Sequence, residues 1–115
     1  MTPFGQKLRE LRRAHRRQLK DLAKALKVSS AYLSALEHGH RARPTPGFVQ
    51  QVAAYFNLAW EDVDELKALA QISDPKPTID TAGLSPLATE VANRLAMRIE
   101  DLDEAALRAL LRQLS

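Results

Sequence analysis

The residues with the clearest chemical signal lie between Lys20 and Arg43 and are suited to contacting DNA. A row of small side chains recurs there at helical spacing, and a helix with a small outer face approaches the base edges of a major groove closely. The predicted base-contacting residues are Ser30, Ala31, Ser34 and Ala35. Hydroxyl, imidazole and cationic side chains adjoin this row, and they suit phosphate oxygens. The predicted phosphate-contacting residues are Lys20, Ser29, Tyr32, His38, His40, Arg41 and Arg43.

The charge distribution favours the same partner. Residues 1–43 contain 11 Lys and Arg against 3 acidic residues, a net charge of +8, whereas residues 44–115 contain 6 against 11, a net charge of −5. A strongly basic segment around a candidate reading helix is typical of nucleic-acid binding. We therefore expect double-stranded DNA as the partner.

Two short helices must position these side chains. Leu22, Ala23 and Leu26 follow the spacing of one apolar helix face. Ser29 is suited to cap the next helix, and Gly39 to end it in the left-handed conformation. The pattern predicts helices over 19–26 and 30–38 joined by a tight turn, which is a helix-turn-helix.

Capping and periodicity signals predict an all-α chain with further helices around this pair. Helices are expected over 3–14, 46–56, 60–71, 86–100 and from 104 to the end. The stretch from Ser73 to Ser85 contains two Pro and one Gly without an apolar period, so it predicts a linker. The expected organisation is a helix-turn-helix domain over 1–72, a linker over 73–85 and a C-terminal helical element over 86–115. Phe56 and Trp60 are expected in the core.

The last two helices have apolar stripes that are too large to leave in water. The stripes must pack either on the first domain or on a second copy of the chain. We favour a homodimer interface, because a second copy would let the protein read a two-fold symmetric DNA site. The predicted interface residues are Leu87, Val91, Leu95, Ile99, Leu107, Leu110, Leu111 and Leu114.

The sequence also resembles a known family, the Cro/cI-type repressors or xenobiotic-response-element family. The shared residues are Leu22, Ala23, Val28, Ser29, Tyr32, Leu33, Ser34, Leu36, Glu37, Gly39, Arg41 and Pro44. The resemblance covers residues 4 to about 71 and implies a five-helix domain followed here by the C-terminal helical hairpin. It implies a transcriptional repressor that places its third helix in the major groove, and a structural hydrogen-bonding role for Glu37.

Other functions find little support. No catalytic residues are expected, since Ser30 and Ser34 have no activating base, and no cofactor is expected without a glycine-rich phosphate loop. His38, His40 and His15 have no acid or Cys at ligand spacing, so no metal is expected. The chain lacks Cys, a membrane-spanning run and a signal-peptide core, which favours a cytoplasmic protein that joins the nucleoid when bound to DNA. An alternative is an antitoxin-like protein that binds its own promoter and neutralises a partner protein through its C-terminal half.

Overall fold

The computed structural model describes all residues from 1 to 115 and contains helices as its only regular elements. The chain divides into two compact units, Met1–Pro77 and Thr78–Ser115, which are described separately. The all-α class predicted from the sequence is confirmed. None of the helices combines the length and the apolar character needed to cross a membrane.

The first unit contains five helices whose ends follow from local capping. Thr2, Ser29 and Thr45 precede α1, α3 and α4, and each side chain accepts a hydrogen bond from a first-turn N–H at 3.0 to 3.2 Å. Gly39 and Asn57 have positive φ angles of 80° and 51° just beyond α3 and α4, where a left-handed residue ends a helix. The helices are α1 (Pro3–Ala14), α2 (Leu19–Leu26), α3 (Ser30–Glu37), α4 (Pro46–Tyr55) and α5 (Trp60–Gln71).

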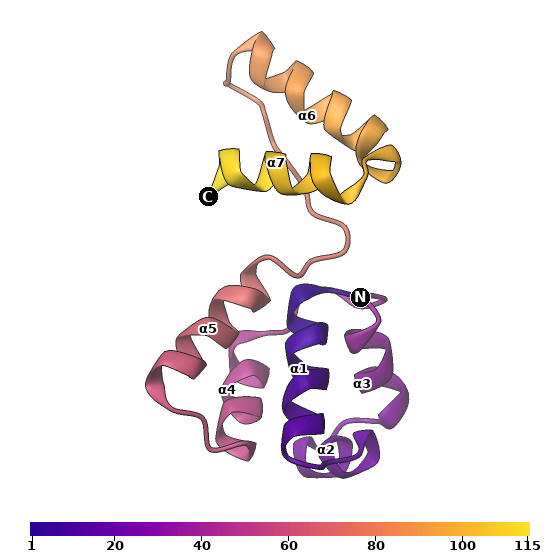
Figure 1. The fold of residues 1–115 in the computed structure, drawn as a ribbon, viewed down its shortest axis with the longest axis vertical. Helices are drawn as coiled ribbons and strands as arrows, with labels where there is room; N and C mark the ends of the chain where they lie inside the picture. The colour runs from indigo at the N-terminus through magenta and orange to yellow at the C-terminus, as the bar shows by residue number, and fades with distance from the viewer. The chain divides into compact units, whose positions relative to one another are not determined.

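One apolar core joins all five helices of this unit. In Figure 1, α1 lies between α3 on one side and α4 and α5 on the other. The buried apolar residues are Phe4, Leu8, Leu22, Ala23, Leu26, Leu33, Leu36, Val49, Val52, Ala53, Phe56, Leu66 and Ala70. A large apolar side chain of this kind contributes about 1.5–3 kcal/mol when fully buried. The first unit therefore has a core of its own, and this core fixes α2 and α3 relative to each other.

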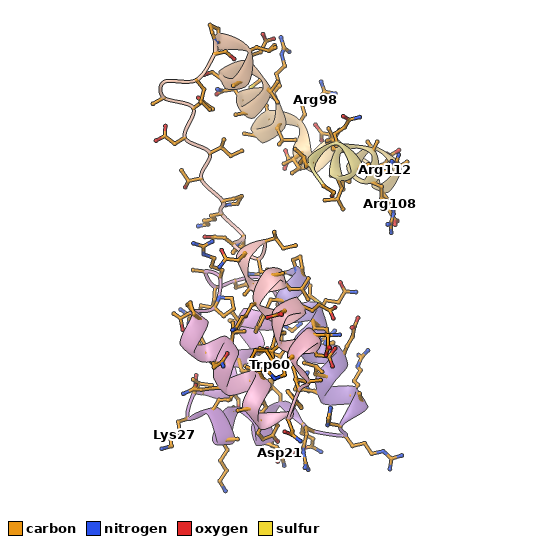
Figure 2. All side chains as sticks on the ribbon, turned by 90° about the vertical axis from the view of Figure 1, so that its left-hand side faces the viewer. Asp21, Lys27, Trp60, Arg98, Arg108 and Arg112 are labelled. Atoms are coloured by element: carbon orange, nitrogen blue, oxygen red, sulfur yellow. The ribbon has the colours of Figure 1, made fainter.

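The prediction that Phe56 and Trp60 both lie in the core is wrong for Trp60. Phe56 is buried and packs its ring against Tyr55, with ring centroids 4.9 Å apart. Trp60 is the first residue of α5 and is 85% exposed, on the face of α5 that is turned to the viewer in Figure 2. Periodicity gives the direction in which a side chain leaves its helix, but it does not say whether another element covers that point.

Ser73 belongs to the first unit, although its place in a Pro-rich stretch assigned it to the linker. The residue is only 3% exposed. Its hydroxyl accepts a hydrogen bond from the backbone N–H of Phe4 at 2.8 Å and donates to the carbonyl oxygen of Leu69. The N–H of Phe4 is one of the first-turn donors that a helix cannot satisfy by itself. Ordered structure thus continues beyond residue 72.

The second unit consists of α6 (Pro86–Arg98), the single 3-10 turn η1 (Ile99–Asp101) and α7 (Glu104–Leu114). Ser85 and Asp103 cap the two α-helices by accepting hydrogen bonds from first-turn N–H groups at 3.2 and 2.8 Å. Ile99, which the sequence places in the sixth helix, begins the 3-10 turn instead. No residue of this unit is buried. Of the eight predicted interface residues, Leu95 is half-buried and the other seven are exposed.

Candidate nucleic-acid interface

The turn between α2 and α3 is built from three residues with distinct roles. Lys27 has a left-handed backbone, with φ of 58°, and ends α2. Val28 donates its N–H to the carbonyl oxygen of Ala23 at 3.0 Å and packs its side chain against the core. Ser29 then caps α3 by accepting a hydrogen bond from the N–H of Tyr32 at 3.0 Å. The predicted pair of helices and the tight turn between them are confirmed.

The structure places all four predicted base-contacting residues on α3. Leu33 and Leu36 point into the core and fix which side of α3 faces outward. On the remaining sides of α3, Ser30 and Ala31 are exposed, and Ser34 and Ala35 are half-buried. The outer surface of α3 is therefore small and shallow, which is the shape that a helix needs to approach base edges closely.

The loop after α3 holds further predicted residues close to the same helix. His38 is exposed, and its Nδ1 lies 2.8 Å from the carbonyl oxygen of Ser34. Arg41 places its guanidinium carbon 5.7 Å from the centre of the Tyr32 ring, a cation–π arrangement. Tyr32 is half-buried and packs edge-on against Phe48, with ring centroids 6.2 Å apart. Tyr32 thus links α3, the following loop and α4.

The other predicted phosphate-contacting residues are dispersed around α2 and α3. Lys20 is exposed in the first turn of α2, and His40 is exposed in the loop after α3. Ser29 uses its oxygen as the cap of α3, so its O–H remains able to donate. Arg43 donates to Oε1 of Gln71 at 3.2 Å and therefore lies against the end of α5. No group of three or more His, Cys, Asp and Glu side chains is arranged to hold a metal ion.

Glu37 is a buried carboxylate inside the first unit. It is 1% exposed, and its two carboxylate oxygens accept hydrogen bonds from Nε and Nη2 of Arg12 at 2.8 and 2.9 Å. Nε of Arg9 lies 3.8 Å from the same carboxylate. A bidentate Arg–carboxylate pair is the geometry expected of a structural tie, and the structural role expected for Glu37 is confirmed.

These ion pairs remove three cations from the basic surface. Arg9 and Arg12 are engaged by Glu37, and Nζ of Lys7 lies 3.7 Å from Glu65 on α5. The remaining basic residues of the segment before α3 are exposed and form no ion pair. They are Arg13, Arg16, Arg17, Lys20, Lys24 and Lys27. The free positive charge is thus concentrated on the end of α1, the loop after it and α2, and Figure 2 shows Lys27 extending away from the unit.

Two features of the scaffold, at Gly5 and Ser73, are absent from the sequence-based predictions. A Cβ on Gly5 would collide with the backbone carbonyl oxygen of Glu37, so Gly5 allows α1 to approach the end of α3 closely. Ser73, which lies 69 residues away in the sequence, accepts a hydrogen bond from the N–H of Phe4 in the first turn of α1. A glycine inside a helix is a signal of close packing, whereas nothing local distinguishes Ser73 from a linker serine.

Comparisons with known proteins agree with this geometry. Residues 3–66 match a family model described as a helix-turn-helix domain. The chain is 41% identical over 63 residues to RghRB of Bacillus subtilis (strain 168), an uncharacterized HTH-type transcriptional regulator. This match covers 55% of the chain and 45% of the relative, so it includes less than half of that protein. No solved structure matches the chain.

Proposed function

The chain belongs to the helix-turn-helix domain family, and on that premise we propose that it is a sequence-specific DNA-binding transcriptional regulator, acting as a dimeric repressor in the cytoplasm. The observation that carries the proposal is the outer surface of α3. This surface is small and accessible, and exposed cations without acidic partners lie on the neighbouring helix. No enzymatic role is proposed, in keeping with the family.

In this proposal, α3 lies in the major groove. Ser30, Ala31, Ser34 and Ala35 contact the bases, with hydroxyl hydrogen bonds and methyl contacts as the available chemistry. Short side chains give modest discrimination at each position, so water bridges and DNA shape contribute to specificity. Phosphates are contacted by Lys20, Ser29, Tyr32, His38, His40, Arg41 and Arg43.

We also propose that the second unit forms the homodimer. Its apolar stripes are only partly covered within the unit, because no residue there is buried and the stripe residues on α6 and α7 include Leu87 and Leu114 at 70% and 80% exposure. Two copies would cover each other's stripes in one helical assembly. A two-fold dimer then predicts a near-palindromic site with half-sites about one helical turn apart, roughly 34 Å.

Footprinting of the protein across the region upstream of its own gene tests the DNA site. We expect protection with dyad symmetry at the predicted spacing. A protected region without any two-fold symmetry would contradict the dimeric arrangement, and the absence of any salt-dependent DNA binding would contradict the proposed function itself.

Two substitutions separate base reading from phosphate binding. Ser34→Glu places a bulky negative charge on the outer surface of α3 and should abolish specific binding, whereas Ala68→Glu adds the same charge on the exposed side of α5 and should not. Lys20→Ala should weaken binding to all sequences alike and lower the slope of log affinity against log salt by about one. Fluorescence anisotropy with labelled duplexes measures the affinity of each variant and its dependence on salt. A changed base preference in Lys20→Ala would contradict this division of roles.

The exposed stripes of the second unit also fit an antitoxin-like alternative, in which another protein covers them. Sedimentation of the purified protein separates the two cases. A dimer at micromolar concentration supports the homodimer, whereas a monomer that still binds DNA favours the different partner.

A further inference from the structure

A crevice in the first unit brings together two segments that are far apart in the sequence. One wall is the loop after α3, residues 39–42, and the other is the segment that leaves α5, residues 74–76. The crevice has a volume of about 550 Å³ and is open to solvent. It is lined by Gly39, His40, Arg41, Ala42, Asp74, Pro75 and Lys76.

Both walls of the crevice are anchored to the helix-turn-helix domain. The N–H of His40 donates to the carbonyl oxygen of Ala35 at 2.8 Å, so the loop continues directly from α3. On the other wall, the buried Ser73 ties the chain to the start of α1. Oδ1 of Asp74 accepts a hydrogen bond from the backbone N–H of Lys76 at 2.9 Å, which closes a local turn. The side chain of Lys76 therefore extends from an anchored segment of backbone, beside the loop that follows α3.

The chemistry of the crevice suits an anion. Arg41 and Lys76 provide two fixed positive charges against the single carboxylate of Asp74, and that carboxylate already accepts a backbone hydrogen bond. His40 adds an exposed imidazole. Neither Arg41 nor Lys76 forms an ion pair elsewhere in the protein.

We propose that Lys76 joins Arg41 and His40 in binding a phosphate of the DNA backbone, so that the segment leaving α5 forms part of the DNA-binding surface. The inference rests on the proposed function, because α3 must lie in the major groove for a phosphate backbone to pass the loop that follows it. Residues 73–77 then act as a DNA contact at the point where the chain departs toward the second unit.

Lys76→Gln in the full-length chain tests the inference, with Lys67→Gln as the matched control. Both lysines are exposed, and Lys67 lies on α5 without lining this crevice. Affinity is measured by fluorescence anisotropy over a range of salt concentrations, with one duplex from the footprinted site and one of unrelated sequence. We expect Lys76→Gln to weaken binding to both duplexes by the same factor and to lower the salt slope by about one, since a phosphate contact carries no sequence information. Lys67→Gln and Lys76→Arg should keep the wild-type slope.

An unchanged affinity and slope in Lys76→Gln would overturn the inference while the wild-type protein still binds DNA. Failure of the wild-type protein to bind either duplex would instead overturn the proposed function. Calorimetric titration with inorganic phosphate distinguishes the source of the anion. Saturable binding that is lost in Lys76→Gln, without any loss of DNA affinity, would assign the crevice to a free anion and contradict the DNA contact.

Discussion

Glu37 and Arg12 face each other inside the first unit, and both side chains are largely removed from water. The side chain of Glu37 is 2% exposed and that of Arg12 is 15% exposed. Loss of one partner would leave the other charge without compensation in a poorly hydrated place, whereas an exposed pair is already compensated by solvent. The buried Glu37–Arg12 ion pair should therefore contribute more to the stability of the protein than an exposed ion pair does.

Glu37→Ala should lower the free energy of unfolding by about 3 kcal/mol, because it leaves the Arg12 guanidinium unpaired. Glu104→Ala on α7 is the control. Glu104 pairs with Arg108 at 2.7 Å, but both side chains are more than two-thirds exposed, so a loss below about 1 kcal/mol is expected. Urea unfolding followed by circular dichroism measures both values. Equal losses in the two variants would contradict a structural role specific to Glu37.

Trp60→Ala should change the free energy of unfolding by no more than about 0.5 kcal/mol, since the side chain is 85% exposed and has little packing to lose. Phe56→Ala removes a buried ring of the core and should cost about 3–5 kcal/mol. Thermal unfolding compares the two. As the single Trp of the chain, Trp60 also reports its own environment by fluorescence, and a water-exposed emission spectrum is expected. A large stability loss or a buried-type spectrum would place Trp60 in an interface.

The position of α3 depends on how closely α1 approaches the C-terminal end of α3. The approach is possible because residue 5 has no side chain, and an added Cβ would lie 2.8 Å from the Cα of Glu37. The contact is with backbone, which cannot rotate away as a side chain can. The reading helix and the α1 scaffold would therefore have to separate.

Gly5→Ala should destabilise the first unit by about 1–3 kcal/mol, the usual effect of overpacking. Gly47→Ala is a matched control, because Gly47 lies within α4 and a Cβ there would meet nothing within 4 Å. Alanine has a higher helix propensity than glycine, so Gly47→Ala should raise the free energy of unfolding by about 0.5–1 kcal/mol. Opposite signs in urea unfolding are the expected result. Changes of the same sign in the two variants would mean that the close approach of α1 to α3 does not require a glycine at position 5.

The two units of the chain differ in how each is stabilised internally. The first unit has a buried core contributed by five helices, whereas the second has no buried residue. A unit of 38 residues without a core is expected to gain its stability from association. This contrast predicts that the first unit folds alone and that pairing depends on the second.

A fragment ending at Pro77 should therefore stay folded but sediment as a monomer. It should lose affinity for a two-fold site by about 10²- to 10⁴-fold, because the two reading helices are no longer linked. The fragment retains Ser73, which satisfies the start of α1. Analytical ultracentrifugation and anisotropy measure the two properties. A fragment that remains dimeric would place the interface in the first unit.

Leu111→Glu in the full chain tests the same interface without truncation. Leu111 is 61% exposed in the single chain, so the charge costs little unless a second copy covers it. Gln113→Glu is the control, since it adds a charge to α7 away from the apolar stripe. Only Leu111→Glu should yield monomers. If both variants sedimented as dimers, α7 would be excluded from the interface.

Residue types and their spacing were enough to predict which segments form helices and where those helices begin, although the sixth helix ends before Ile99 rather than after it. Ser29 and Thr45 cap helices because their side chains reach first-turn N–H groups three residues away, and Gly39 ends α3 through its own backbone conformation. Such interactions involve neighbours along the chain, so their residue types and spacing suffice. The core side of α3 follows in the same way from the spacing of Leu33 and Leu36.

Which residues meet across long separations in the chain depends on the packing of the helices. The packing of the five helices creates the hydrogen bond from Phe4 to Ser73 and the crevice between Arg41 and Lys76. No local sequence pattern encodes either of them. The exposure of Trp60 is of the same kind, since a helix period gives the direction of a side chain but not what covers it. Packing is set by the sum of many weak contacts throughout the core, so partners, burial and close approaches are properties of the folded unit.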